Sequence, residues 1–249
     1  MRSGIAHFGN SYASATCAAG YSELQFQGDY YLAFRDLAAI FRRFVHGVRA
    51  LDFGCGAGRS TRFLRECGFE AAGADIAAEM IHRARELDPA GDYRLIGDGD
   101  FSGLAKDAYD LVLCAFPFDN IPGRDRKVAL FRGLAELLCA DGCIVLLAST
   151  PEIYVHEWVS FTTAAFPENR LARNGDVVRI VNTAAGHIDP VEDVLWTDEA
   201  YRDVFASAGL EVLEKRNPMG SEGEPYAWVN ETRIAPWAIY VLSRVRRSR

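Results

Sequence analysis

The sequence predicts an α/β fold with a doubly wound, mostly parallel sheet. Between residues 51 and 147, short runs of β-branched and aliphatic residues alternate with amphipathic stretches, and this pattern is typical of βαβ units. A glycine-rich turn begins at Gly54, directly after the first of these runs, and such turns bind ligands at the carboxyl ends of strands. We therefore expect helices on both faces of the sheet and a ligand site where its strands end.

Eight segments carry this alternation. The expected strands are residues 51–53, 71–74, 93–96, 110–115 and 143–147, and the expected helices are residues 61–67, 78–87 and 127–139. A further helix should precede them, because apolar residues recur at helical spacing from Tyr31 to Val45 until Gly47 closes the run.

The alternation lapses between Pro151 and Thr197. Aromatic residues, two valine-rich runs and Asn-Gly and Asp-Pro turn signals predict an inserted helix and a short hairpin there. A helix over 198–208 and strands over 210–215 and 237–242 should follow. The loop between these two strands is too long for a hairpin turn, and its aromatic residues favour a lid over disorder.

The segment Leu51-Asp-Phe-Gly-Cys-Gly-Ala-Gly58 describes a nucleotide site. Its glycines allow a tight turn and a close approach of the backbone to a ligand. Asp75 follows about one βα unit later, where a carboxylate can accept hydrogen bonds from both ribose hydroxyls of an adenosine. The pattern therefore indicates a cofactor-binding turn.

The spacing of the glycines distinguishes between cofactors. Gly54, Gly56 and Gly58 read G-x-G-x-G, whereas a dinucleotide fingerprint has its third glycine one residue later, where Arg59 stands. Asp52 would repel a diphosphate but could organise a site for an ammonium group. S-adenosylmethionine has an adenosine, an ammonium group and no phosphate, so it fits better than NAD, and an NAD-dependent oxidoreductase is disfavoured.

Several motifs, in this order, resemble those of class I S-adenosylmethionine-dependent methyltransferases. The glycine turn resembles the first motif of the family, and Gly73-Ala-Asp75-Ile76 resembles its ribose-binding turn. Ile96-Gly-Asp98-Gly-Asp100-Phe101 is similar to the turn that contacts the adenine amino group, and residues 109–118 resemble the strand with the fourth motif. The resemblance covers residues 51–149 and implies a Rossmann-like sheet of seven strands with an antiparallel edge.

The resemblance also implies which residues bind the cofactor. Met80 stands where the family often packs an apolar side chain on the adenine, and aromatic faces can stabilise a sulfonium. The expected contacts with S-adenosylmethionine are Tyr30, Asp52, Gly54, Cys55, Gly56, Asp75, Ile76, Met80, Asp98, Gly99, Asp100, Ala115 and Phe116.

The sequence departs from the family in two places. Ala140-Asp141-Gly142 stands where the family usually has Pro-Gly-Gly, and both Asp and Gly suit a turn. Asp119 and Asn120 stand where many members that act on small molecules have a His or an Asn-Tyr pair, which leaves the methyl acceptor open.

Methyl transfer from a sulfonium requires in-line alignment at roughly 3 Å and exclusion of water more than it requires a catalytic side chain. A base is needed only for a protonated acceptor. Asp119 and His156 are the candidate bases, with His187, Glu222 and Glu231 as further candidates, and a surface or hydrogen-bonding role is the alternative for each. The expected substrate contacts are Phe118, Asn120, Tyr226 and Trp228, although packing accounts equally well for Phe118 and Trp228.

Composition narrows the partners of the chain. The formal net charge of −7 argues against a surface that follows nucleic-acid phosphates, and the arginines in residues 244–249 read as a solvated terminus. No apolar run reaches the roughly 18 residues that span a bilayer, and the first residues lack the apolar core of a signal peptide. Six cysteines without a C-x-x-C pair indicate buried thiols and no metal site. We expect a cytoplasmic protein with no membrane partner.

We interpret the chain as one methyltransferase domain, 1–249. Its parts are an N-terminal helical segment (1–48), a cofactor-binding core (49–150), an inserted substrate cap (151–197) and a C-terminal helix with edge strands and the lid loop (198–249). The insertion either covers the pocket or forms a homodimer contact, and the sequence leaves both open.

The leading hypothesis is methyl transfer to an oxygen or nitrogen of a small molecule, in secondary metabolism and in a lid-covered pocket. An RNA or protein methyltransferase is the first alternative, disfavoured because the sequence lacks an Asn-Pro-Pro-Tyr motif and a basic face. A non-catalytic regulatory protein that binds S-adenosylmethionine is the second alternative, because fold alone does not establish catalysis.

Overall fold

A seven-stranded sheet forms the centre of the protein, in the order β3-β2-β1-β4-β5-β10-β9. The structure is a computed structural model that describes residues 26–184 and 190–245. The strands are β1 (Arg49–Phe53), β2 (Glu70–Asp75), β3 (Asp92–Leu95), β4 (Tyr109–Ala115), β5 (Leu138–Ser149), β9 (Leu210–Arg216) and β10 (Trp237–Arg244). β10 is antiparallel to β5 and to β9, whereas the pairs from β3 to β5 are parallel. The predicted mostly parallel sheet of seven strands is confirmed.

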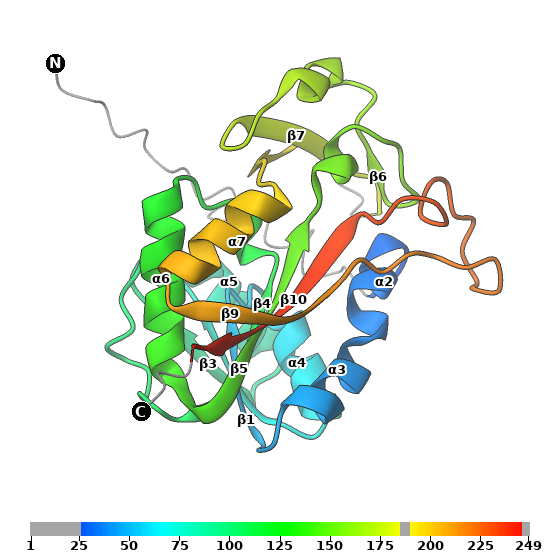
Figure 1. The fold of residues 1–249 in the computed structure, drawn as a ribbon. Helices are drawn as coiled ribbons and strands as arrows, with labels where there is room; N and C mark the ends of the chain where they lie inside the picture. Colours follow the sequence, from blue (N-terminus) through cyan, green and yellow to red (C-terminus); the bar gives the residue numbers. More distant parts are fainter. Residues whose placement is uncertain (1–25, 185–189, 246–249) are drawn as a thin grey trace, which may run out of the picture.

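Helices cover both faces of this sheet (Figure 1). One face packs against α2 (Asp29–Arg35), α3 (Leu37–Phe44) and α4 (Arg59–Glu66). The other packs against α6 (Arg124–Leu137) and α7 (Asp198–Ser207), and α5 (Ala78–Leu87) contacts β2 and β3. The single helix expected from Tyr31 to Val45 is two short helices that meet at Asp36.

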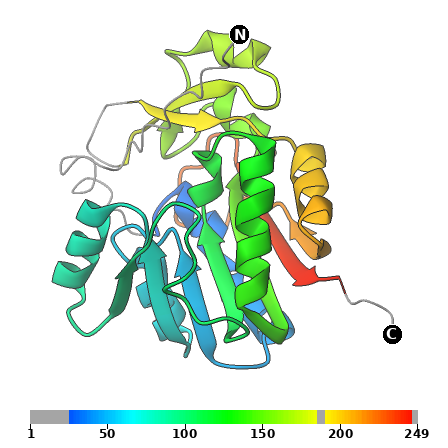
Figure 2. The ribbon, with the colours of Figure 1, turned by 90° about the vertical axis from the view of Figure 1, so that its left-hand side faces the viewer.

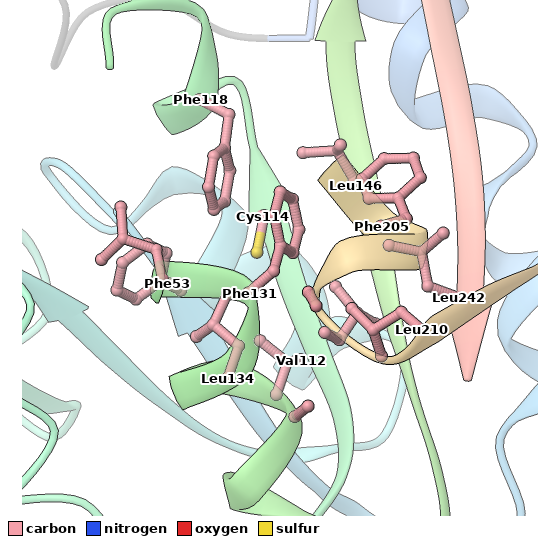
Figure 3. Close-up of a cluster of buried hydrophobic side chains, with 14 of the residues drawn as sticks. Phe53, Val112, Cys114, Phe118, Phe131, Leu134, Leu146, Phe205, Leu210 and Leu242 are labelled. Atoms are coloured by element: carbon pink, nitrogen blue, oxygen red, sulfur yellow. The ribbon is translucent and has the colours of Figure 1, made fainter. Parts of the chain in front are cut away.

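The apolar strand β4 explains how one sheet builds two cores. Successive side chains of a strand point to opposite faces, so Val112 and Cys114 join the core under α6 and α7, where Phe131 packs (Figure 3). Leu111 and Leu113 join the core under α2 and α3. All four strand residues are fully buried. Because the sheet is packed on both faces, the carboxyl ends of its strands are held in fixed positions.

The turn expected at residues 140–142 lies within β5 as an irregularity. Tyr109 of β4 pairs with Leu138, but Leu111 pairs with Cys143, so β5 carries extra residues at this point. A Cβ on Gly142 would lie 2.6 Å from the carbonyl oxygen of Tyr109. The absence of a side chain at Gly142 therefore permits the close approach of β4 and β5 at this point.

A small second sheet lies above the carboxyl ends of the central strands (Figures 1 and 2). It consists of β6 (Phe161–Thr162), β7 (Val177–Asn182) and β8 (Val191–Val194), in that order and antiparallel. The predicted hairpin is present as β7 and β8, but the expected inserted helix is absent from the described residues. Two short 3-10 turns, η3 (Pro151–Tyr154) and η4 (Pro167–Leu171), stand there instead, since each begins with a proline and the segment between them is rich in β-branched residues.

A buried pair of acids ties the N-terminal helix to two loops. The backbone N–H of Ser160 donates to Oδ2 of Asp29 at 2.8 Å. Glu231, in the loop between β9 and β10, accepts from the N–H groups of Val159, Val229 and Asn230. Both acids are fully buried and interact with each other. Glu231 is therefore a structural anchor, and the loop that carries it is held against α2.

This pair should make stability fall as the pH rises. Burial and the negative charge of Glu231 raise the pKa of Asp29 to about 8 from 3.8, so the folded protein keeps a proton that the unfolded chain releases. The stability from this group is fully present below about pH 4 and is lost as the pH rises through about 8. Asp29→Asn, whose amide can donate at any pH, should lessen the fall in melting temperature between about pH 5 and pH 8 by at least ~2 °C.

Scanning calorimetry across this pH range measures the effect. Glu66→Gln is the matched control, because Glu66 is an exposed acid at the end of α4, and it should keep the wild-type pH dependence. If the melting temperature of the Asp29→Asn protein falls with pH as steeply as that of the wild type, the pair does not share a proton.

Candidate functional site

A pocket lies at the carboxyl ends of β1, β2, β4 and β5, beneath the second sheet. Its lower part is lined by the glycine turn, the end of β2 and the turn after β3, and its upper part by the segment after β4 and by side chains of β6, β7 and β8. The predicted position of the site at the strand ends is therefore where the structure has its pocket. Because β6, β7 and β8 all contribute to the lining, the second sheet forms the upper wall of the pocket.

The glycine turn adopts a backbone that other residues rarely take. Gly54, Gly56 and Gly58 have φ angles of 73°, 52° and 81°, all in the left-handed region that favours glycine. A Cβ on Gly54 would lie 2.5 Å from Pro117, and one on Gly58 would lie 2.6 Å from the ring of Tyr93. The turn therefore requires its glycines, and Gly54, Cys55 and Gly56 line the pocket.

Asp75 holds this turn in place. Its Oδ2 accepts from the backbone N–H of Gly56 at 2.8 Å, and its Oδ1 accepts from the N–H of Ala77 at 2.8 Å. Burial raises its pKa, while these backbone hydrogen bonds lower it. Each carboxylate oxygen has a second acceptor position, and Asp75 lines the pocket. The carboxylate therefore keeps an acceptor position on each oxygen at the pocket.

Asp52 does not reach the pocket surface, contrary to the expectation that it contacts the cofactor directly. It is fully buried, and its Oδ2 accepts from the hydroxyls of Ser60 at 2.7 Å and Thr61 at 2.6 Å. Burial raises its pKa to about 6. Its Oδ1 has no hydrogen-bond partner among the described residues. Ser60 does line the pocket, so Asp52 acts on the site through the first turn of α4.

The turn after β3 supplies one wall of the pocket. Ile76, Met80, Asp98 and Gly99 line it, as expected. Asp100 does not, because its side chain is exposed and its Oδ1 instead accepts from the N–H of Ser102. Ile96, Gly97 and Arg126 also line this wall but were not among the expected contacts. The guanidinium of Arg126 pairs with Asp98 at 2.5 Å, and nothing in the helical pattern of α6 marked it.

An aromatic group surrounds the centre of the pocket. Tyr30 and Phe116 line it, as expected, together with Ala115. Trp237 joins them, with its ring centroid 6.0 Å from that of Tyr30 and 4.7 Å from that of Phe116. The guanidinium of Arg59 lies 4.5 Å from the centroid of the Tyr30 ring, and burial raises the pKa of Tyr30 to about 12.

Arg59, Phe161 and Trp237 line the pocket but were missed as site residues. Arg59 did carry a signal, since it occupies the position of the third glycine of a dinucleotide fingerprint. The periodicity of the sequence indicates a core position for Trp237, and this residue is both buried and part of the pocket wall. Phe161 lies on β6 of the second sheet, a strand that the sequence did not predict.

Three expected substrate contacts lie elsewhere. Phe118 is fully buried and stacks on Phe131 with ring centroids 4.1 Å apart (Figure 3). The rings of Tyr226 and Trp228 are tilted against each other with centroids 4.7 Å apart, and the ring of Tyr226 also contacts that of Tyr31 on α2. Neither Tyr226 nor Trp228, the two expected contacts from the predicted lid loop, lines the pocket. The cover comes from the second sheet instead, because its short strands reach over the strand ends.

Some of the candidate bases line the pocket and others lie outside it. Asp119 and its neighbour Asn120 line the pocket. His156 lies outside it and pairs with Glu152 at 3.0 Å. Glu222 is exposed, Glu231 is the buried anchor described above, and His187 lies outside the described residues. Asp119 is thus the one sequence-predicted base among the described residues that meets the pocket.

Asp119 belongs to a buried polar cluster that also contains Asp193, an acid of β8 that sequence analysis missed. Asp119 accepts from the N–H and the hydroxyl of Ser149 at 3.0 and 2.7 Å. Asp193 accepts from the amide of Asn120 at 2.6 Å and from the hydroxyl of Tyr154 at 3.1 Å. Both carboxylates line the pocket. Their burial raises the pKa of Asp119 to about 6 and that of Asp193 to about 7.

Two other kinds of site are not formed by the part of the chain that the structure describes. Among residues 26–184 and 190–245, no three His, Cys, Asp or Glu side chains gather in a way that could hold a metal ion. No helix in the same ranges is long and apolar enough to cross a membrane. The five described cysteines are free thiols, and Cys55, Cys114 and Cys143 are buried.

The sequence matches a known family over its central part. The family described as Methyltransferase domain matches residues 51–144. A ubiquinone biosynthesis O-methyltransferase of Xanthomonas oryzae pv. oryzae is 30% identical over 132 residues, which are 51% of this chain and 51% of that protein. The protein of the same name from Xanthomonas campestris pv. campestris is 29% identical over 114 residues, 43% of this chain and 46% of the relative. The chain therefore spans about half the length of the curated relatives it matches.

Solved structures resemble the whole fold. The CcbJ methyltransferase of Streptomyces caelestis has a TM-score of 0.63 at 18% identity, covering 92% of this chain and 96% of that one. An S-adenosylmethionine-dependent methyltransferase of Mesorhizobium loti has a TM-score of 0.60 at 17% identity, covering 85% and 98%. Together with the sheet order and the domain matched over residues 51–144, these likenesses show that the chain has the fold of S-adenosylmethionine-dependent methyltransferases.

Proposed function

We propose that this chain transfers the methyl group of S-adenosylmethionine to a nitrogen or oxygen of a small molecule held beneath the second sheet. The observation that carries this proposal is one continuous pocket, which runs from Asp75 and the glycine turn to Asp119 and Asp193 under the cover. The relatives named as O-methyltransferases of ubiquinone biosynthesis support a small acceptor. A cytoplasmic reaction in secondary metabolism is part of the same proposal.

The residues present fit this cofactor. Asp75 is oriented to receive the ribose hydroxyls, and the glycine turn leaves room for the backbone to approach the ligand. Met80 and Ile76 offer apolar contacts for the adenine, and Asp98 an acceptor for its amino group. The buried Oδ1 of Asp52, which lacks a partner among the described residues, adds negative charge behind the turn, where an ammonium group would be stabilised.

When bound, S-adenosylmethionine supplies a methyl group that its positively charged sulfur already activates. The chain then has to align the acceptor and exclude water. Tyr30, Phe116 and Trp237 line the pocket, and aromatic rings favour a nearby cation. Phe161 and Ile180 of the second sheet close the pocket from above, so that water is kept from the reacting atoms.

The first test is a calorimetric titration with S-adenosylmethionine, S-adenosylhomocysteine and NADH. We expect micromolar binding of the first two and none of NADH, because the site holds an acid at the ribose and lacks a diphosphate cradle. Release of S-adenosylhomocysteine with small amines or alcohols as acceptors then measures turnover. Binding of the cofactor without turnover of any acceptor would favour a regulatory protein, and binding of NADH alone would overturn the proposal.

Asp75 should contribute strongly to cofactor affinity. Hydrogen bonds to a charged group contribute about 1.5–3 kcal/mol, so Asp75→Asn should weaken S-adenosylmethionine about 10- to 100-fold. The titration above measures this change. Asp125→Asn is the control, because the side chain of Asp125 is 98% exposed, and its affinity should equal that of the wild type. An unchanged affinity in Asp75→Asn would remove the ribose assignment.

A further inference from the structure

The acceptor end of the pocket carries two acids that come from opposite sides. Asp119 lies on η2 (Pro117–Asp119), directly after β4, and Asp193 lies on β8 of the cover. They are 6% and 8% exposed, and this small exposed surface faces the pocket that both line. Burial, and after it the negative charge of Asp119, raises the pKa of Asp193. Two buried carboxylates on one pocket are costly unless a cation compensates them.

One cation lies behind them. Lys127 of α6 is fully buried and donates to the carbonyl oxygen of Phe118, and its ammonium lies 4.7 Å from the centroid of the Trp196 ring. Its charge lowers the pKa of both carboxyl groups. Lys127 does not line the pocket. Burial lowers the pKa of Lys127 to about 7, so near neutral pH this lysine offsets at most one of the two carboxylates, and the remaining negative charge faces the ligand.

The two acids differ in how many hydrogen bonds they already accept. Asp119 is held by the N–H and the hydroxyl of Ser149, and the hydroxyl of Tyr201 lies 3.5 Å away. Asp193 accepts one bond on each oxygen, from Asn120 and from Tyr154. An ionised carboxylate offers about four acceptor positions. Asp193 therefore keeps free positions toward the pocket, whereas Asp119 is largely committed to its own loop.

We propose that the methyl acceptor is a small amine that enters as its ammonium ion, is bound between Asp193 and Asp119, and gives its proton to Asp193. This inference rests on the proposed function and adds the substrate class and a catalytic residue to it. The ammonium group supplies the charge that the three buried groups lack. Asp193 is the base because it has free acceptor positions, and Asp119 remains ionised to hold the resulting cationic product.

The step balances in atoms and electrons. One proton passes from the ammonium nitrogen to a carboxylate oxygen of Asp193, and the nitrogen keeps the electron pair of the broken N–H bond. That pair forms the new bond to the methyl carbon, while the electron pair of the S–CH₃ bond returns to sulfur. The product is a methylated ammonium ion beside a neutral Asp193, which later loses its proton to solvent. The pKa of Asp193, which burial raises to about 7, suits proton uptake near neutral pH.

The primary experiment compares amines with alcohols of the same shape. Phenethylamine against phenethyl alcohol, and cyclohexylamine against cyclohexanol, are added to wild-type protein loaded with S-adenosylhomocysteine, and binding is followed by ligand-observed NMR. We expect each amine to bind at least tenfold more tightly than its alcohol. The absence of a difference within the pairs, whether both members bind or neither does, overturns the inference.

Asp193→Asn tests the assigned residue. Its amide oxygen can still accept from Asn120, so the fold of the cover should be kept, and the amine preference should fall to about one. Turnover of any amine that reacts should fall about 100-fold and should lose its dependence on a group that titrates near pH 7. Affinity for S-adenosylmethionine, measured by calorimetry, should not change.

Glu192→Gln is the matched control, because Glu192 neighbours Asp193 on β8 but points to solvent and pairs with Arg179. It should keep the wild-type preference for amines. A preference that survives in Asp193→Asn overturns the role of this acid. The inference fails separately from the proposed function: alcohols methylated in preference to amines would contradict the inference alone, whereas a protein that binds no S-adenosylmethionine contradicts the proposed function.

Discussion

The hydrogen bonds from Gly56 and Ala77 to the carboxylate of Asp75 are the constraint on which the site depends. They join the ends of β1 and β2 in one rigid turn. The turn is possible because β1 and β2 are parallel neighbours, so that both strands end at the same edge of the sheet. The glycines then remove the Cβ atoms that would collide with Pro117 and Tyr93. Fold and ligand site are therefore one arrangement of the backbone, and the side chain of Asp75 fixes both.

The features that the sequence predicted correctly are those that local patterns determine. Alternating apolar runs determine buried parallel strands, and the glycine spacing with its acid determines the turn, so the sheet and the Gly54, Gly56 and Asp75 positions followed from the residues. Asp52 and Asp100 were misplaced because a motif gives the position of a residue along the chain and not the direction of its side chain. Phe118 shows the same limit, since its stacking on Phe131 depends on a helix that lies later in the sequence.

The sequence predicted the hairpin of β7 and β8, but the rest of the second sheet and the direction of its side chains could not be predicted, for a different reason. Its strands pair antiparallel across loops, and their register depends on contacts with α2 and β10 that no local pattern encodes. Asp193 is one acid in an exposed-looking stretch, Val191-Glu-Asp-Val194. Only the three-dimensional pairing shows that it turns inward to Tyr154 and Asn120 while Glu192 turns outward to Arg179. The alternation of a strand is what separates these neighbouring acids in function.

Most residues that the sequence predicted belong to the cofactor end of the pocket, and most that it did not predict belong to the acceptor end. The family match ends at residue 144. The matched part includes the glycine turn, Asp75 and Asp119. It does not include Ser149, Tyr154 and Asp193. The matched part thus contains most groups assigned to the cofactor, which is common to the family, and the remainder contains most groups assigned to the acceptor. Asp119 lies at the boundary, since it follows β4 of the core and is held by Ser149 at the end of β5. In the proposed binding of an amine, the charge balance therefore joins an acid that follows β4, an acid of the second sheet and a lysine of α6, so that both sheets contribute to the acceptor end of the pocket.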